Sequence, residues 1–238
     1  MEEKINLLRD WVAASHSIVF FGGAGVSTES GIPDFRSVDG LYHTQYDYPP
    51  ETILSRSFFD ANPSEFFRFY RQKLLHPEAA PNPAHYRLAQ WEKEGRLAAV
   101  VTQNIDGLHQ AAGSKKVLEL HGSVWRNACM QCGKAYPMSF IQQNGDIPRC
   151  TCGGIIKPDV VLYEEALDQA VLAAASRAIA AADLLIIGGT SLAVYPAAGL
   201  VRLFQGKHLT VINKSPTPMD KTADLLIQDS IGQVLGTL

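Results

Sequence analysis

The chain has 238 residues, of which 46% are hydrophobic, and a formal net charge of −3 at pH 7. This length fits one large domain, or one domain carrying a smaller insert, and the hydrophobic share is sufficient for a buried core. The slightly acidic balance and the lack of a long Lys/Arg run argue against a general nucleic-acid-binding surface.

Nothing in the sequence indicates secretion or a membrane span. The acidic start, Met1-Glu2-Glu3, has the wrong charge for a signal peptide. The most apolar region, residues 166–196, is interrupted by Asp168, Arg177 and Asp183, which favours a buried helix followed by a strand. A soluble cytoplasmic protein without membrane contact is therefore expected.

Short apolar runs alternate with helical stretches along most of the chain. Ile5, Leu8 and Val12 have helical spacing, so an amphipathic helix begins the chain. Residues 17–21 form a continuous apolar run, which is typical of a buried parallel strand. Similar runs occupy residues 97–102, 117–120, 184–187, 209–212 and 225–227, with helices expected at 84–93 and 167–182. This alternation predicts an α/β fold, a Rossmann-like parallel sheet covered on both faces.

Two regions interrupt the alternation. Residues 39–80 are rich in aromatic residues and proline and have helical spacing near their end, and residues 123–160 hold all four cysteines. We expect these regions to form a smaller inserted module together. The sheet domain would then comprise residues 1–38, 81–122 and 161–238.

The cysteines have the spacing of a zinc ribbon. They stand at Cys129, Cys132, Cys150 and Cys152, as one C-x-x-C pair and one tighter C-x-C pair. Two turns that each supply a close pair of thiolates give the tetrahedral site that zinc prefers. Four sulfur ligands leave no position for water, so the metal would be structural. The alternatives are two disulfides or four unrelated core thiols, and the absence of secretion signals disfavours the disulfides.

A glycine-rich segment, residues 22–31, follows the first predicted strand. Glycines at a strand end let the backbone approach a pyrophosphate. The strict G-x-G-x-x-G pattern fails because Thr28 occupies its last position, so a tight structural turn is about as well supported as a nucleotide site. The continuation places Asp34, Phe35 and Arg36 in one loop, and so long a loop after a glycine turn is typical of a functional segment. Asp34 could otherwise cap an Asx turn, and Phe35 could fill the core.

Polar residues also follow other predicted strands. Residues 103–106, with the sequence Gln-Asn-Ile-Asp, could bind ribose hydroxyls and a carboxamide, although Asn and Asp are equally common in ordinary turns. His121 ends the strand at 117–120 and could act as a general base, although a lone histidine is more often a packed or capping residue. Six other histidines compete with it. Residues 188–191 form another glycine turn, and Asn213 ends the next strand.

Taken together, residues 23–37, 102–109, 120–122, the four cysteines, 188–191 and 211–213 strongly resemble the sirtuins, the NAD-dependent protein-lysine deacylases. These motifs occur in the family's order and cover nearly the whole chain. The resemblance implies that the large domain binds NAD as a cosubstrate and that one structural zinc ion is held by the cysteines. It also implies that acetylated lysine side chains of proteins are the substrate, without nucleic-acid or membrane partners. A monomer is expected.

The resemblance also implies roles for single residues. Asn104 and His121 would be catalytic, with His121 as the general base; Gln103 and Asn104 would lie near the nicotinamide ribose, and Ile105 and Asp106 in the nicotinamide pocket. The implied NAD-binding residues are Gly23, Ala24, Gly25, Thr28, Asp34, Phe35, Arg36, Gln103, Asn104, Ile105, Asp106, His121, Gly189, Thr190, Ser191, Asn213, Asp229 and Ser230. His109 is expected to pack a helix.

The substrate peptide would add as a strand to residues Val160, Val161, Leu162 and Tyr163. The family has a Phe-Gly-Glu tip where this chain has Leu162-Tyr163-Glu164, a departure that affects side-chain preference more than backbone pairing. An ordinary strand over residues 160–162 that leads into the next helix is the alternative.

The implied reaction transfers the acyl group of lysine to ADP-ribose and releases nicotinamide. The aromatic helical segment around residues 65–73 predicts an apolar acyl tunnel and a preference for acetyl over succinyl groups, although Lys73 keeps one positive charge there. The alternatives are an ADP-ribosyltransferase or NAD glycohydrolase, which also cleave nicotinamide from NAD, and a non-catalytic NAD-responsive binding module.

Overall fold

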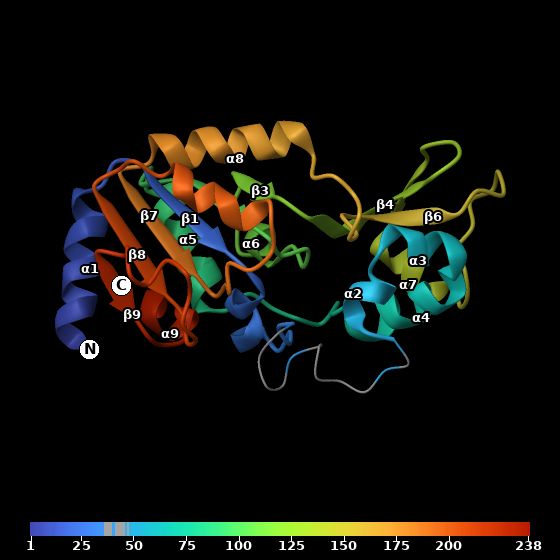
Figure 1. Ribbon diagram of the computed structural model, residues 1–238, viewed down its shortest axis with the longest axis horizontal. Helices are drawn as coiled ribbons and strands as arrows, with labels where there is room; N and C mark the ends of the chain where they lie inside the picture. The colour runs from blue at the N-terminus through green and yellow to red at the C-terminus, as the bar shows by residue number, and fades with distance from the viewer. Residues whose placement is uncertain (36–39, 41–45, 47) are drawn as a thin grey trace.

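The computed structural model describes residues 1–35, 40, 46 and 48–238. Within these residues a six-stranded sheet runs in the order β3-β2-β1-β7-β8-β9, and every neighbouring pair is parallel. Figure 1 shows this sheet in the larger part of the molecule, together with both chain termini. The strands are β1 (Ile18–Gly22), β2 (Leu97–Thr102), β3 (Val117–Glu119), β7 (Leu184–Gly188), β8 (His208–Ile212) and β9 (Leu225–Ile227). The predicted parallel α/β sheet is confirmed.

The strand order reverses beside β1. From β1 the chain first builds β2 and β3 on one side and then β7, β8 and β9 on the other. At such a reversal the two connections leave in opposite directions, and a crevice opens outside the carboxyl ends of β1 and β7. The sheet topology alone therefore locates where a ligand would bind.

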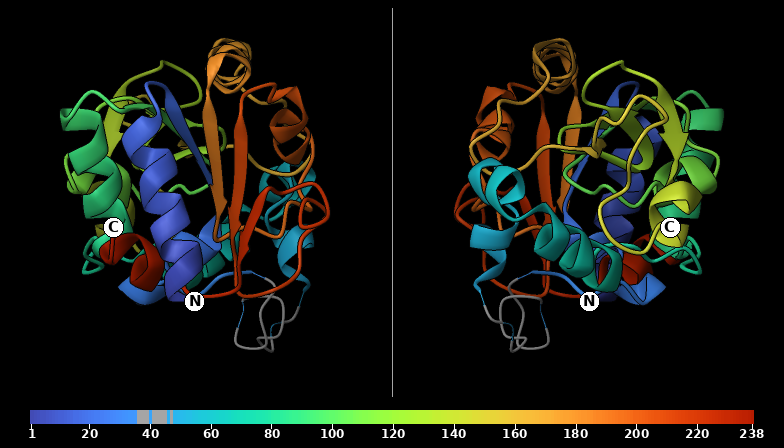
Figure 2. Two further views of the ribbon diagram at one scale, coloured as in Figure 1. Left: turned by 90° about the vertical axis from the view of Figure 1, so that its left-hand side faces the viewer. Right: turned by 90° about the vertical axis from the view of Figure 1, so that its right-hand side faces the viewer.

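Both faces of the sheet are covered by helices, which explains why its strands are apolar throughout. Phe20 faces a cluster with α1 (Glu2–Ala14), α5 (Pro83–Lys93) and α9 (Ile231–Gly236). Its neighbours Val19 and Phe21 face the opposite cluster, with α8 (Gln169–Ala181) and the 3-10 helix η4 (Ala197–Leu203). Figure 2 shows the sheet between these layers.

The helix predicted over residues 167–182 begins at Gln169. The side chain of Asp168 caps it by accepting hydrogen bonds from the backbone N–H groups of Ala170, at 2.7 Å, and Val171, at 3.0 Å. An aspartate at this position also interacts favourably with the helix dipole. Hydrophobic periodicity does not reveal such a capping residue, so the helix start predicted from periodicity is too early.

The smaller part of the molecule has its own core. Within the described residues, an antiparallel sheet of order β5-β4-β6 contains β4 (Gly122–Cys129), β5 (Ala135–Pro137) and β6 (Ile156–Val160). Its helices are α2 (Pro50–Ile53), α3 (Arg56–Ala61), α4 (Pro63–Lys73) and α7 (Met138–Gln143). Phenylalanines of α3 and α4 and apolar residues of β4, β6 and α7 share one buried cluster. The two inserted regions thus pack together, while the exact domain boundaries stay a prediction.

No helix in the described part of the chain combines the length and the apolar character needed to cross a membrane.

Candidate active site

A cleft of about 890 Å³ lies at the carboxyl ends of the parallel strands and is lined from both parts of the molecule. It receives every sequence-predicted NAD-side and peptide-side residue that the structure describes; Arg36 lies outside the described residues. The NAD-side residues in its lining are Gly23, Ala24, Gly25, Thr28, Asp34, Phe35, Gln103, Asn104, Ile105, Asp106, His121, Gly189, Thr190, Ser191, Asn213, Asp229 and Ser230. The peptide-side residues are Val160, Val161, Leu162 and Tyr163. Segments far apart in the sequence thus meet at one site.

Two glycine turns pack backbone against backbone at the strand reversal. The Gly25 N–H donates to the carbonyl oxygen of Gly189 at 2.8 Å. A Cβ atom on Gly25 would lie 2.9 Å from that oxygen, and one on Gly189 would lie 2.4 Å from the backbone nitrogen of Val26. Gly189 also has a φ of +58°, which favours glycine. Thr28, which breaks the strict fingerprint, donates its hydroxyl to the Gly25 carbonyl at 3.1 Å and closes the turn.

The loop after β2 is held by buried polar contacts. The Ser27 hydroxyl donates to Oδ2 of Asp106 at 2.6 Å and accepts from Nδ2 of Asn104 at 3.1 Å. The other carboxylate oxygen, Oδ1, accepts from the Leu108 N–H at 2.9 Å. Nε2 of Gln103 donates to Thr190 Oγ1 at 3.0 Å, which ties this loop to the second glycine turn. Each carboxylate oxygen keeps acceptor capacity, so Asp106 can still bind a carboxamide N–H group.

The imidazole of His121 is held by a backbone carbonyl group, which fixes its tautomer. Its Nδ1 lies 3.0 Å from the carbonyl oxygen of Gln103. A carbonyl only accepts hydrogen bonds, so Nδ1 carries the proton and Nε2 keeps its lone pair. Burial lowers the pKa of His121, and the hydrogen bond to Gln103 only partly opposes that shift. The imidazole is therefore neutral at pH 7, the form that accepts a proton.

The predicted peptide-binding segment has few free amides. The N–H groups of Val161 and Tyr163 donate to the carbonyl oxygens of His121, at 3.0 Å, and Leu54, at 2.9 Å. The Leu162 N–H donates to the Glu165 carboxylate at 2.9 Å. The carbonyl oxygens of Val160, Leu162 and Tyr163 also accept hydrogen bonds, from Lys157 and from the N–H groups of Glu165 and Arg56. A substrate strand would therefore have to replace some of these bonds or share their acceptors. Regular strand β6 ends at Val160, so the alternative of an ordinary strand through residue 162 is wrong.

The four cysteines form a site that fits a metal ion. Their sulfur atoms all lie within 4.8 Å of one another. The Cys129–Cys152 and Cys132–Cys150 sulfur pairs are each 3.5 Å apart, far longer than a disulfide of about 2.05 Å. Sulfur atoms about 2.3 Å from a tetrahedral zinc ion are separated by about 3.8 Å, close to the observed spacing. β4 spans from beside His121 to Cys129, on the order of 20 Å in an extended strand, so this site lies far from the imidazole.

The positive charges of α4 are distributed unequally around the cleft. Lys73 lines it, together with His76. Arg71 instead donates to the carbonyl oxygens of Ile141, at 2.7 Å, and Asn144 at the end of α7. Arg68 pairs with Glu65 at 2.6 Å. Among the described residues of the lining there is no arginine.

Sequence reasoning gave no role to several residues of the cleft lining, among them Ser27 and Trp125. Ser27, only 1% exposed, lies inside the glycine motif, where the preference of serine for turns conceals its role. Trp125 lines the cleft from β4, and no local pattern distinguishes it from a surface residue. The hydroxyl group of Ser27 within a glycine-rich loop was the signal that could have indicated its role.

Comparison with known proteins gives a consistent result. A model of the Sir2 family matches residues 23–196. A protein of Clostridium acetobutylicum named NAD-dependent protein deacetylase is 59% identical over 240 residues, covering 99% of this chain and 98% of the relative. A solved structure described as a basis for the mechanism and regulation of Sir2 enzymes has a TM-score of 0.90 and 42% identity, covering 100% of this chain and 96% of the other. A Sir2 structure described in complex with the inhibitor EX-527, 2′-O-acetyl-ADP-ribose and a deacetylated p53 peptide has a TM-score of 0.84 and 38% identity, covering 97% and 95%. This chain belongs to the Sir2 family.

Proposed function

We propose that this protein is an NAD-dependent protein-lysine deacetylase that transfers the acetyl group of lysine to ADP-ribose and releases nicotinamide. The observation that carries the proposal is the meeting, in one cleft, of a neutral His121 with the glycine turns and the loop at residues 103–106. The name of the relative from Clostridium acetobutylicum, 59% identical over almost the full length, supports the same activity.

NAD suits the half of the cleft formed by the large sheet. Gly23, Gly25 and Gly189 of the turns after β1 and β7 line the cleft, and a lining without Cβ atoms there lets a pyrophosphate approach the backbone closely. Asn213 and Asp229 line the far end and would hold the adenosine half. Gln103 and Asn104 would bind the nicotinamide ribose, and Ile105 and Asp106 the nicotinamide ring and its carboxamide.

The reaction then needs one base in the protein. As the bond from ribose C1′ to nicotinamide breaks, the amide oxygen of acetyl-lysine forms a bond to C1′. Nε2 of His121 accepts the proton of a ribose hydroxyl, and the resulting oxygen attacks the acetyl carbon. Water then completes the release of free lysine and O-acetyl-ADP-ribose. A buried, correctly tautomeric imidazole suits this proton transfer, because its lone pair is available at neutral pH.

The metal is proposed to be zinc and to be structural. Four thiolates would saturate a tetrahedral ion, and the bound metal would hold the turns at the ends of β4 and β6 together. None of the four cysteines is in a disulfide, which suits a reducing compartment such as the cytoplasm. We place the enzyme there, acting on acetylated proteins.

The test is mass spectrometry of acetyl-lysine peptides incubated with NAD. We expect nicotinamide and O-acetyl-ADP-ribose to form only when an acylated peptide is present. Nicotinamide release at the same rate without peptide would instead indicate a glycohydrolase. ADP-ribose attached to the protein or peptide would indicate an ADP-ribosyltransferase, and NAD binding without turnover a binding module.

A further inference from the structure

Trp125 connects β4 to the loop that follows β2. Its indole Nε1–H donates to the backbone carbonyl oxygen of Asp106 at 2.7 Å. The N–H of the preceding residue, Val124, donates to the Ile105 carbonyl oxygen at 3.0 Å. Two consecutive carbonyl groups of the loop are thus held by two consecutive residues of the strand.

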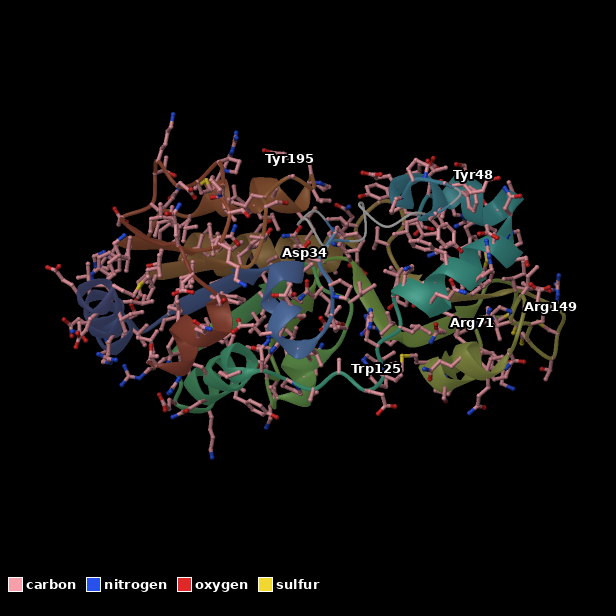
Figure 3. The ribbon with its side chains drawn as sticks, turned by 90° about the horizontal axis from the view of Figure 1, so that it is seen from below. Asp34, Tyr48, Arg71, Trp125, Arg149 and Tyr195 are labelled. Atoms are coloured by element: carbon pink, nitrogen blue, oxygen red, sulfur yellow. The ribbon has the colours of Figure 1, made fainter. Side chains whose placement is uncertain are left out.

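The strand is distorted where this contact forms. The pairing of β4 with β6 shifts between Ser123 and Asn127, so Trp125 lies outside the regular ladder. Its side chain is 50% exposed, yet it lines the cleft at the junction of the large and small parts (Figure 3). A large aromatic ring held half in water is poorly explained by core packing, and the indole hydrogen bond gives it a specific reason to lie there.

The residue that follows Asp106 makes this hydrogen bond important. Gly107 has a φ of +76°, and a Cβ atom on it would lie 2.6 Å from Nε1 of Trp125. The indole therefore lies directly against the Gly107 backbone. A peptide plane that precedes glycine rotates easily, because glycine adopts either sign of φ. The indole N–H fixes the direction of the Asp106 carbonyl and so the orientation of this plane.

We propose that Trp125 is a positioning residue for the nicotinamide end of the cleft. By fixing the Asp106–Gly107 peptide it holds the side chains of Ile105 and Asp106 in their binding geometry, while Ser27 and the Leu108 N–H hold the carboxylate itself. This role rests on the proposed function, which assigns nicotinamide to these residues. A hydrogen bond of ordinary net strength corresponds to a two- to tenfold change in an equilibrium constant, and that is the expected size of the effect.

Two substitutions separate the hydrogen bond from the ring. Trp125→Phe keeps an aromatic ring and removes the donor. Trp125→His restores a donor, because imidazole Nε2 stands two bonds from Cγ, as indole Nε1 does. Tyr86→Phe is the matched control: it changes a 54% exposed aromatic residue on α5 that does not line the cleft. For each protein we would measure inhibition of deacetylation by nicotinamide, affinity for ADP-ribose by calorimetry, zinc content and Tm.

The Phe variant should need two- to tenfold more nicotinamide for half-inhibition, with ADP-ribose affinity within twofold of wild type and unchanged zinc content. The His variant should recover most of the lost nicotinamide sensitivity, and Tyr86→Phe should match wild type. Wild-type nicotinamide sensitivity in the Phe variant would overturn the inference, as would an equal loss of ADP-ribose affinity, which indicates a general disturbance of the cleft. A wild-type protein without NAD-dependent turnover would refute the proposed function and this inference with it, whereas an active wild type with an unaltered Phe variant refutes the inference alone.

Discussion

Replacing His109 by leucine should make the folded protein less sensitive to acid. His109, on α6 (Leu108–Ala111), and His85, on α5, have their ring centroids 4.7 Å apart. His109 is 1% exposed, and neither of its ring nitrogens has a hydrogen-bond partner among the described residues. Burial lowers the pKa of His109 to about 3 and that of His85 to about 4. His109 thus packs a helix, as expected, and its burial lowers the free energy of unfolding at low pH.

The magnitude follows from the two pKa values. In the unfolded chain a histidine takes up its proton near pH 6.5, while both buried rings stay neutral in the folded protein at pH 5. The unfolded state therefore binds more protons below pH 6.5, and the free energy of unfolding decreases as the pH falls. Between pH 7 and pH 5 each histidine should cost about 2 kcal/mol. Leucine has a similar volume and no polar atom, so His109→Leu should remove about half of the combined loss.

Urea denaturation followed by circular dichroism at pH 7 and pH 5 measures this effect. Protonation of the cysteines affects the free energy of unfolding of wild type and of His109→Leu equally, so it cancels when the two proteins are compared. Gln110→Leu changes an exposed residue without an ionisable group on the same helix and should keep the wild-type pH dependence. The reasoning is refuted if wild type loses less than about 1 kcal/mol between the two pH values, or if His109→Leu loses as much as wild type.

Three further predictions concern the site. His121→Ala should fold and bind NAD but lose about a hundredfold or more in kcat/KM for an acetyl-lysine peptide. Turnover of the variant within a few-fold of wild type would exclude His121 as the base. Because burial lowers the pKa of His121, the kcat/KM of the wild type should decrease only at pH values below the range in which histidine ordinarily titrates. Chelation of the metal, or Cys129→Ser, should lower the Tm and the activity together, whereas an unchanged melting curve at full turnover would contradict a structural metal. Acetyl-lysine peptides should have higher kcat/KM than succinyl-lysine peptides, because no described arginine lines the cleft to pair with the distal carboxylate of the succinyl group. Equal kcat/KM for both peptides would indicate that Lys73 pairs with that carboxylate. Lys73→Met would then abolish the use of the succinyl peptide.

The parallel sheet could be predicted because its strands are buried on both faces. β2 was predicted over the residues it occupies, since a strand such as Leu97–Thr102 has no polar face to obscure its pattern. The glycine turns and the polar strand ends followed from the same topology, because parallel strands bring their carboxyl ends to one edge. The family resemblance then supplied roles that residue patterns alone left undecided.

The small antiparallel sheet was not predicted strand by strand. β4 alternates buried and exposed residues only in part, because its register shifts around Trp125. The contacts of Ser27 and Trp125 join residues 79 and 19 positions apart, and such pairings depend on tertiary packing rather than on a local pattern. For the same reason the sequence did not show that the amides of residues 161–163 already donate within the protein.

The close backbone contact between Gly25 and Gly189 has a mechanical consequence. Adjacent strands end in turns that touch without intervening side chains and share a hydrogen bond, so these turns have no soft layer that would let one slide over the other. The floor of the cleft should therefore behave as one stiff body. We expect a change in cleft width on loading with substrate to involve the small part and the connecting segments, where protection from hydrogen exchange should rise while the two turns stay unchanged.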